Sequence, residues 1–118
     1  MYESEKQSLI DCALQMKAEQ LIKGNGGNVS LRVDDDRFLV TPSAMDYETM
    51  EPSDVVVVDA AGNVVEGTRR PTSDITAVLY VFNHRPDINA VIHTHQPYAT
   101  ALSLVADELP ADFVTVID

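Results

Sequence analysis

The sequence has few of the features that stabilise secreted domains or bind nucleic acids. Its 118 residues include a single cysteine, Cys12, so no disulfide can form within the chain and nothing indicates an oxidising compartment. Lys and Arg number 8 against 19 Asp and Glu, which gives a formal net charge of −11. This balance argues against a nucleic-acid partner, because phosphate backbones require clustered basic residues. A small anionic substrate remains compatible with it, since one phosphate needs only a few local donors.

Long apolar runs and a signal peptide are also missing. No apolar run approaches the ~20 residues of a transmembrane helix, and Met1–Lys6 has no basic segment followed by an apolar one. We therefore expect a cytoplasmic protein with no membrane partner. Hydrophobic residues make up 45% of the sequence, which is enough to build one core.

Hydrophobic periodicity predicts helices that alternate with strand hairpins. A first helix is predicted from about Glu5 to Lys23, with a capping box at Ser4 and a stop at Gly24. A second helix follows Ser73 as its N-cap and ends before Pro86, and a third begins at Pro97. Strands are predicted over residues 29–33, 38–41, 55–59, 64–66, 90–94 and 114–117. This order predicts a layered α/β domain, and since the sequence ends within the last strand we expect it to be part of a longer protein.

The strongest candidate for a functional site is the pair His93 and His95. Alternate residues of a strand point to the same side, so both imidazoles project from one face, with their Cα atoms about 6.6 Å apart. Neutral imidazole suits zinc, and catalytic zinc commonly has three protein ligands and one open position. The pattern alone also fits two polar residues at a fraying strand end.

Several loops offer donors to an anion. The segment from Gly24 to Asn28 is neither a P-loop nor a dinucleotide fingerprint, but its glycines can present backbone N–H groups to a ligand. A plain turn between a helix and a strand explains the same residues. Hydroxyl and N–H groups also come from Thr41–Ala44 and from Pro71–Asp74, which opens the second helix.

Asp74 has two competing interpretations. An acidic residue in the first turn of a helix commonly serves only as a partner of the helix dipole. If its carboxylate faces a metal-bound substrate, it can instead act as a general base.

In their order and spacing, these motifs resemble those of class II aldolases of the fuculose-phosphate type. The same family includes ribulose-phosphate 4-epimerases and the adducin head domain. The resemblance covers nearly the whole chain and is specific for the family rather than for a substrate. It rests on Gly26–Ser30, Thr41–Ser43, Pro52–Val56, Glu66–Gly67, Pro71–Asp74, Arg85–Val91 and His93–His95.

The resemblance implies a three-layer α/β/α domain around a mostly antiparallel sheet, of which residues 1–118 form the N-terminal portion. It implies one zinc per subunit, held by His93, His95 and a third histidine beyond Asp118. The reaction implied is aldol cleavage and condensation of a phosphorylated ketose through a metal-stabilised enediolate. Asp74 stands at the position of the catalytic acid/base, and the phosphate-binding positions are Gly27, Asn28, Ser43, Ala44, Thr72 and Ser73.

The family also implies a homo-oligomer, a tetramer in the full-length form. For the 118 residues alone, we expect apolar positions of Val55–Val58 and Val114–Ile117 to be partly exposed and to drive oligomer formation or aggregation.

Three residues depart from the family pattern. Asp74 replaces the usual glutamate, so the carboxylate lies about 1.5 Å further back, a distance that matters for proton transfer. Val78 stands where a histidine is common, and Ala44 stands where a glycine is common. Two alternatives therefore stay open, a phosphopentulose 4-epimerase and a catalytically inactive, adducin-like interaction domain.

Overall fold

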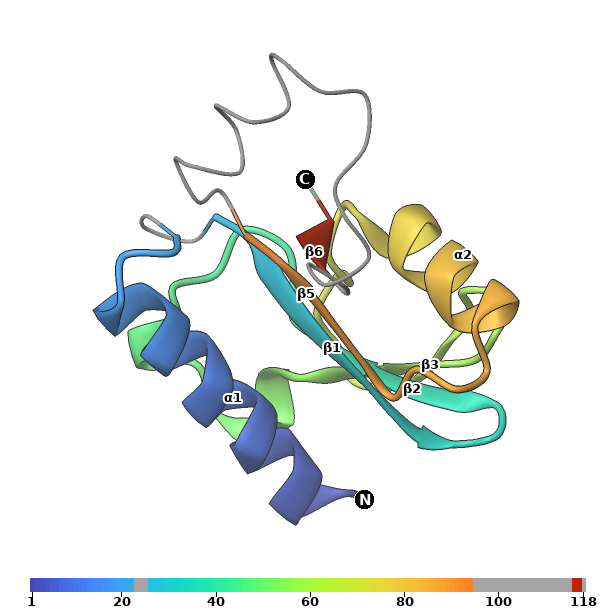
Figure 1. The fold of residues 1–118 in the computed structure, drawn as a ribbon. Coiled ribbons are helices and arrows are strands. Elements are labelled where there is room, and N and C mark those ends of the chain that lie inside the picture. Colours follow the sequence, from blue (N-terminus) through green and yellow to red (C-terminus); the bar gives the residue numbers. More distant parts are fainter. Residues whose placement is uncertain (23–25, 95–115, 118) are drawn as a thin grey trace, which may run out of the picture.

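The computed structural model describes residues 1–22, 26–94 and 116–117 of the chain (Figure 1). The helix predicted from Pro97 and the second predicted metal ligand, His95, lie outside these ranges. In the described part, no helix is long and apolar enough to cross a membrane. The elements are α1 (Glu3–Ala18), β1 (Asn28–Asp34), β2 (Arg37–Val40), the 3-10 helices η1 (Tyr47–Thr49) and η2 (Pro52–Asp54), β3 (Val56–Val58), β4 (Val64–Glu66), α2 (Ile75–His84), β5 (Ala90–His93) and β6 (Val116–Ile117).

The strands form one sheet in the order β4-β3-β2-β1-β5-β6. Every pair of neighbours from β4 to β5 is antiparallel, and β6 alone runs parallel to its neighbour β5. The helices α1 and α2 lie on opposite faces of this sheet (Figure 1). The predicted three-layer α/β/α arrangement with a mostly antiparallel sheet is therefore confirmed.

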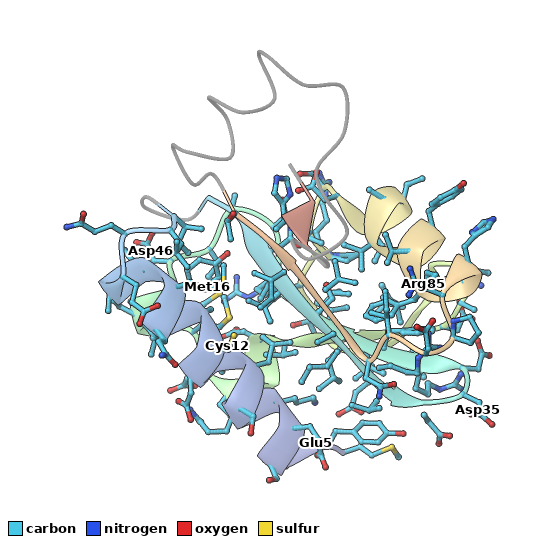
Figure 2. All side chains as sticks on the ribbon, in the orientation of Figure 1. Glu5, Cys12, Met16, Asp35, Asp46 and Arg85 are labelled. Atoms are coloured by element: carbon cyan, nitrogen blue, oxygen red, sulfur yellow. The ribbon has the colours of Figure 1, made fainter. Side chains whose placement is uncertain are left out.

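Two apolar layers fill the spaces between the sheet and its helices, because side chains alternate between the faces of a strand. Leu39 packs with α1, whereas its neighbours Phe38 and Val40 pack with α2. Met16 reaches inward from α1, while the charged side chains of Glu5 and Arg85 lie on the outside (Figure 2).

The expected exposure of Val55–Val58 is wrong. All four valines are at most 1% exposed. Val55 and Val57 belong to the layer under α1, and Val56 and Val58 belong to the layer under α2. An unbroken β-branched run here marks a strand that is covered on both faces.

The first helix ends at Ala18 rather than near Lys23. Gln20 adopts a left-handed conformation with φ 63°, and the N–H of Leu21 donates to the carbonyl of Met16 at 2.9 Å. These are the features of a Schellman motif, in which glycine normally takes the left-handed position. The predicted helix end at Gly24 is therefore wrong, because Gln20 takes the left-handed position that a glycine normally takes.

Neither predicted N-cap forms. Ser4 already lies inside α1, whose N-cap position is held by Tyr2 with no side-chain hydrogen bond. The N-cap position of α2 is Asp74 rather than Ser73, and again no side chain caps the helix. The Thr72 hydroxyl instead accepts a long hydrogen bond, 3.4 Å, from the N–H of Asp74.

Arg32 of β1 holds the C-terminal end of α2. Its guanidinium lies 5.1 Å from the ring centroid of Phe38 and 5.2 Å from that of Phe82. The same group donates to the carbonyl of Phe82 at 2.8 Å and to that of Ile88 at 3.2 Å. A cation at these carbonyls is favoured by the helix dipole and by the two aromatic faces.

Candidate active site

Two loops that are distant in the sequence lie side by side next to the sheet. Pro42, after β2, forms an antiparallel bridge with Pro71, before α2. The N–H of Ser43 donates to the carbonyl of Arg70 at 2.8 Å. This pairing places the hydroxyl of Ser43 near the start of α2, where Thr72 and Ser73 lie.

A cavity of about 370 Å³ opens between these loops, the start of β1 and the end of β5. Five of the six residues predicted to bind phosphate line it, together with Asp74 and His93. Asn28 does not line the cavity, and His95 lies outside the described residues. The full lining is Gly26, Gly27, Pro42, Ser43, Ala44, Thr72, Ser73, Asp74 and His93.

The Asp74 carboxylate is tied to the sheet rather than to its own helix. Its Oδ2 atom lies 2.8 Å from the amide nitrogen of Asn28 and 2.8 Å from Nδ1 of His93. The Asp74 side chain is 41% exposed and that of His93 is 13% exposed. Contacts with Asn28 and His93 thus hold the Oδ2 atom in place, while Asp74 still lines the cavity.

These contacts assign the protonation of His93. A carboxylate oxygen at 2.8 Å only accepts hydrogen bonds, so Nδ1 carries a proton. The contact of 3.4 Å between Nδ1 and the Asn28 amide is then a contact between two donors, not a hydrogen bond. In the neutral tautomer, the lone pair belongs to Nε2, the nitrogen with which His93 would bind a metal.

Asn28 was predicted to bind phosphate, but its side chain lies outside the cavity lining. It is 1% exposed, and its amide N–H donates to Asp74 behind the cavity wall. Within the described residues, its side-chain oxygen has no hydrogen-bond partner. The contact in the structure is therefore with the carboxylate, and phosphate binding by Asn28 stays a prediction.

The described residues supply part of a metal site. They contain no group of three His, Cys, Asp or Glu side chains placed to hold one ion. His93 nevertheless has the arrangement expected of a zinc ligand, because metal-bound histidines commonly donate their other ring N–H to a carboxylate. A zinc site built on His93 therefore fits this part of the chain.

Tyr47 contacts the loop that lines the cavity, although no sequence motif selected it. Its hydroxyl lies 2.8 Å from the carbonyl oxygen of Gly27 and 3.2 Å from that of Gly26. Burial raises the pKa of Tyr47 to about 12, so its hydroxyl stays protonated. No local pattern points to it, because it lies in the single-turn helix η1, 20 positions beyond Gly27.

Ala44 has a backbone conformation that suits glycine, the residue that the resemblance described above leads us to expect at this position. Its φ is 56°, in the left-handed region, where a Cβ atom costs about 1–2 kcal/mol. The cost falls on a residue that lines the cavity.

We expect Ala44→Gly to raise the free energy of unfolding by about 0.5–1 kcal/mol, because the relief of strain exceeds the added entropy of the unfolded chain. Denaturant titration measures the change. Ala77→Gly is the matched control, since Ala77 is exposed inside α2 and should lose about 1 kcal/mol. A loss of stability in both variants would contradict the strain at Ala44.

Comparison with known proteins places this geometry in a family. Residues 7–117 match the model of the class II aldolase and adducin N-terminal domain. The chain is 35% identical over 112 residues to 5-deoxy-D-ribulose 1-phosphate aldolase of Bacillus thuringiensis serovar kurstaki, covering 94% of this chain and 53% of that protein. It is 40% identical over 108 residues to L-ribulose-5-phosphate 4-epimerase UlaF of Salmonella paratyphi B, covering 90% and 47%.

A solved structure of L-fuculose 1-phosphate aldolase superposes with a TM-score of 0.78 at 41% identity, covering 83% of this chain and 47% of that one. The chain thus spans about half the length of the relatives it matches. Because the match to the family model extends over almost all of its residues, the chain belongs to the class II aldolase and adducin N-terminal domain family.

Proposed function

We propose that the protein is a zinc-dependent aldolase that cleaves and forms a carbon–carbon bond of a phosphorylated ketose. The observation that carries this proposal is one cavity lined by the Asp74–His93 pair and by the hydroxyl residues Ser43, Thr72 and Ser73. The names of the relatives support it, since two of them are sugar-phosphate aldolases.

The phosphate group would bind at the end of the cavity formed by Gly27, Ser43, Ala44, Thr72 and Ser73. Backbone N–H groups and hydroxyls are suitable donors, and the start of α2 adds its partial positive charge. Ser73 is exposed and makes no helix cap, so its hydroxyl can turn to a ligand. Binding the phosphate away from the reacting bond orients that bond within the cavity.

The zinc would be held by Nε2 of His93, by His95 and by a third histidine. When bound, such an ion supplies a Lewis acid that stabilises the negative charge developing on the ketose oxygens as the bond breaks. The Asp74 contact on Nδ1 keeps the His93 ring in the tautomer and orientation that binding requires.

Asp74 would move the proton at the nucleophilic carbon of the ketose fragment. The hydrogen bonds from Asn28 and His93 both reach Oδ2, so Oδ1 is the atom that exchanges the proton. Anchoring one oxygen from two sides limits the rotation of the carboxylate. This fixed orientation preorganises Oδ1 for the proton transfer.

Two other functions differ from this one in what they require. A 4-epimerase of a phosphopentulose would use the same residues, and the relative from Salmonella paratyphi B favours it as second candidate. An inactive, adducin-like domain would have no need for the Asp74–His93 pair inside a cavity.

We further propose that residues 1–118 are the N-terminal portion of a single class II aldolase-like domain, and that the protein is cytoplasmic and homo-oligomeric.

The test is product analysis with ketose phosphates, followed by NMR. An aldolase converts one ketose phosphate into two carbonyl fragments, whereas an epimerase yields an isomer of unchanged mass. Removal of zinc by a chelator should stop either reaction. Neither product from any ketose phosphate, with zinc present, would leave the interaction domain as the function.

Metal analysis tests the zinc ligands directly. The intact protein should contain about one zinc per subunit, and a His93→Ala, His95→Ala double variant should contain almost none. His84→Ala is the control, because His84 lies exposed at the end of α2 with Nδ1 on the carbonyl of Tyr80. Unchanged zinc content in the double variant would remove both histidines from the site.

A further inference from the structure

We propose that Tyr47 is a positioning residue that sets the conformation of the phosphate-binding loop without touching the substrate. The inference rests on the proposed function for the identity of the ligand. It concerns the segment Gly26–Gly27, which lines the cavity, and a hydroxyl that does not. Tyr47 is 2% exposed and packs in the layer under α1.

The hydroxyl determines which way two peptide groups face. It donates toward the carbonyl oxygens of Gly26 and Gly27 at 3.2 and 2.8 Å. The chain has no cis peptide bond among its described residues, so the N–H of each of these peptides points away from its carbonyl. The N–H groups of Gly27 and Asn28 are therefore directed away from Tyr47. Asn28 lies opposite His93 in the β1–β5 ladder, so its N–H belongs to the sheet pairing and the N–H of Gly27 is the one left for a ligand.

That direction is the one a bound anion requires. Gly26 and Gly27 line the cavity and Tyr47 does not, so the side of the loop turned away from Tyr47 is the cavity side. The backbone N–H of Gly27 can therefore donate to an anion in the cavity, as the N–H groups of anion-binding loops do. The buried hydroxyl thus holds the carbonyl oxygens, which would repel a phosphate, out of its way.

The loop needs such a tie because glycine backbones are otherwise free to rotate. Gly27 has φ 72°, and glycine populates positive and negative φ about equally in the unfolded chain. Tyr47 itself is fixed by its packed ring, and its raised pKa of about 12 keeps the hydroxyl a donor over the working pH range. A rigid donor therefore restrains a flexible loop.

Tyr47→Phe removes this donor and leaves the ring in place. We expect the dissociation constant of inorganic phosphate, measured by calorimetry on the intact, zinc-loaded protein, to rise about tenfold, the size of one lost hydrogen bond. The KM of the phosphorylated ketose should rise by a similar factor, while kcat changes less than about twofold, because the loop binds without taking part in the reaction.

Tyr2→Phe is the matched control, since Tyr2 lies at the opposite end of α1 from this loop and should leave phosphate binding unchanged (Figure 1). The melting temperature of both variants is recorded, and binding is measured well below it. A Tyr47→Phe variant that loses stability but binds phosphate as before would overturn the proposal, as would a lower kcat at unchanged KM. Because the phosphate measurement needs no turnover, it stands even if the protein is no aldolase.

Discussion

Replacing Asp74 with asparagine should lower kcat by about 10²–10⁴-fold, the contribution of a positioned general base. The amide oxygen of the new side chain can still accept a hydrogen bond from Asn28 or His93, so the local packing is retained. It cannot take up a proton at neutral pH. Steady-state kinetics on the true substrate measures the loss.

The same variant should stay folded and keep its metal. Asp74 makes no side-chain cap on α2, so the loss of its charge at the helix start costs less than about 1 kcal/mol. Zinc content and melting temperature are therefore expected to match those of the parent protein. Wild-type turnover in Asp74→Asn would leave Asp74 as a partner of the helix dipole only.

Two further variants define the role of the carboxylate. Asp74→Glu should retain activity, because it restores the residue usual in the family, and a changed substrate preference is the expected side effect. Asp35→Asn removes the same charge at the exposed tip of the β1–β2 hairpin, away from the cavity, and should leave kcat unchanged. Equal losses in Asp35→Asn and Asp74→Asn would point to net charge rather than to proton transfer.

Gly27→Ala should lower the free energy of unfolding by about 2–4 kcal/mol and weaken phosphate binding at the same time. An added Cβ would lie 2.6 Å from the carbonyl oxygen of His93 and 2.6 Å from a methyl carbon of Ile22. The methyl group of Ile22 can turn aside, but the His93 carbonyl belongs to the strand β5. Relief of the clash therefore moves either the loop or the residue proposed to bind zinc.

Gly62→Ala separates the clash from backbone strain. Gly62 also has a positive φ, 92°, but a Cβ there would meet only a side-chain carbon of Leu79 at an ordinary 3.5 Å. The Gly62→Ala variant should lose only the free energy of unfolding that corresponds to left-handed strain, about 1–2 kcal/mol, and its phosphate affinity should not change. Denaturant titration of both variants decides the matter, and equal losses at the two glycines would refute the close approach of β5.

The strands and the faces of the helices could be predicted because their signals are local. The unbroken β-branched run Val55–Val58 marks a buried strand, and the helical spacing of Val78, Leu79 and Phe82 marks the buried face of α2. The sheet order could not be read in the same way. The pairing of β1 with β5 joins segments about 60 residues apart. The order of the elements predicted a layered domain, but only the family resemblance anticipated three layers around a mostly antiparallel sheet.

Helix ends were predicted less well, since a capping residue competes with its neighbours for the N–H groups at the helix start. Thr72, which is 6% exposed, accepts from the N–H of Asp74, whereas an N-cap hydroxyl at Ser73 would have accepted from the N–H of Ile75 or Thr76. The end of α1 near Gln20 was missed for a related reason. Packing of the helix against the sheet can impose a left-handed conformation on a residue other than glycine.

Within the site, the sequence identified which residues line the cavity but not what holds them. Ser43, Thr72, Asp74 and His93 were all selected from motifs, and all line the cavity. The contact of Asn28 with Asp74 spans 46 positions and depends on the register of two strands and a helix, which no local motif encodes.

Strand β1 contacts both ends of α2, through Asn28 to Asp74 at one end and through Arg32 to the carbonyl of Phe82 at the other. Four strand residues advance about 13 Å, and the ten residues of α2 advance about 15 Å, so the two lengths are matched. An insertion or deletion within α2 would shift one end by about 1.5 Å per residue and break one of the two contacts. The number of residues in this helix is therefore as much a part of the catalytic geometry as the identity of the carboxylate at its start.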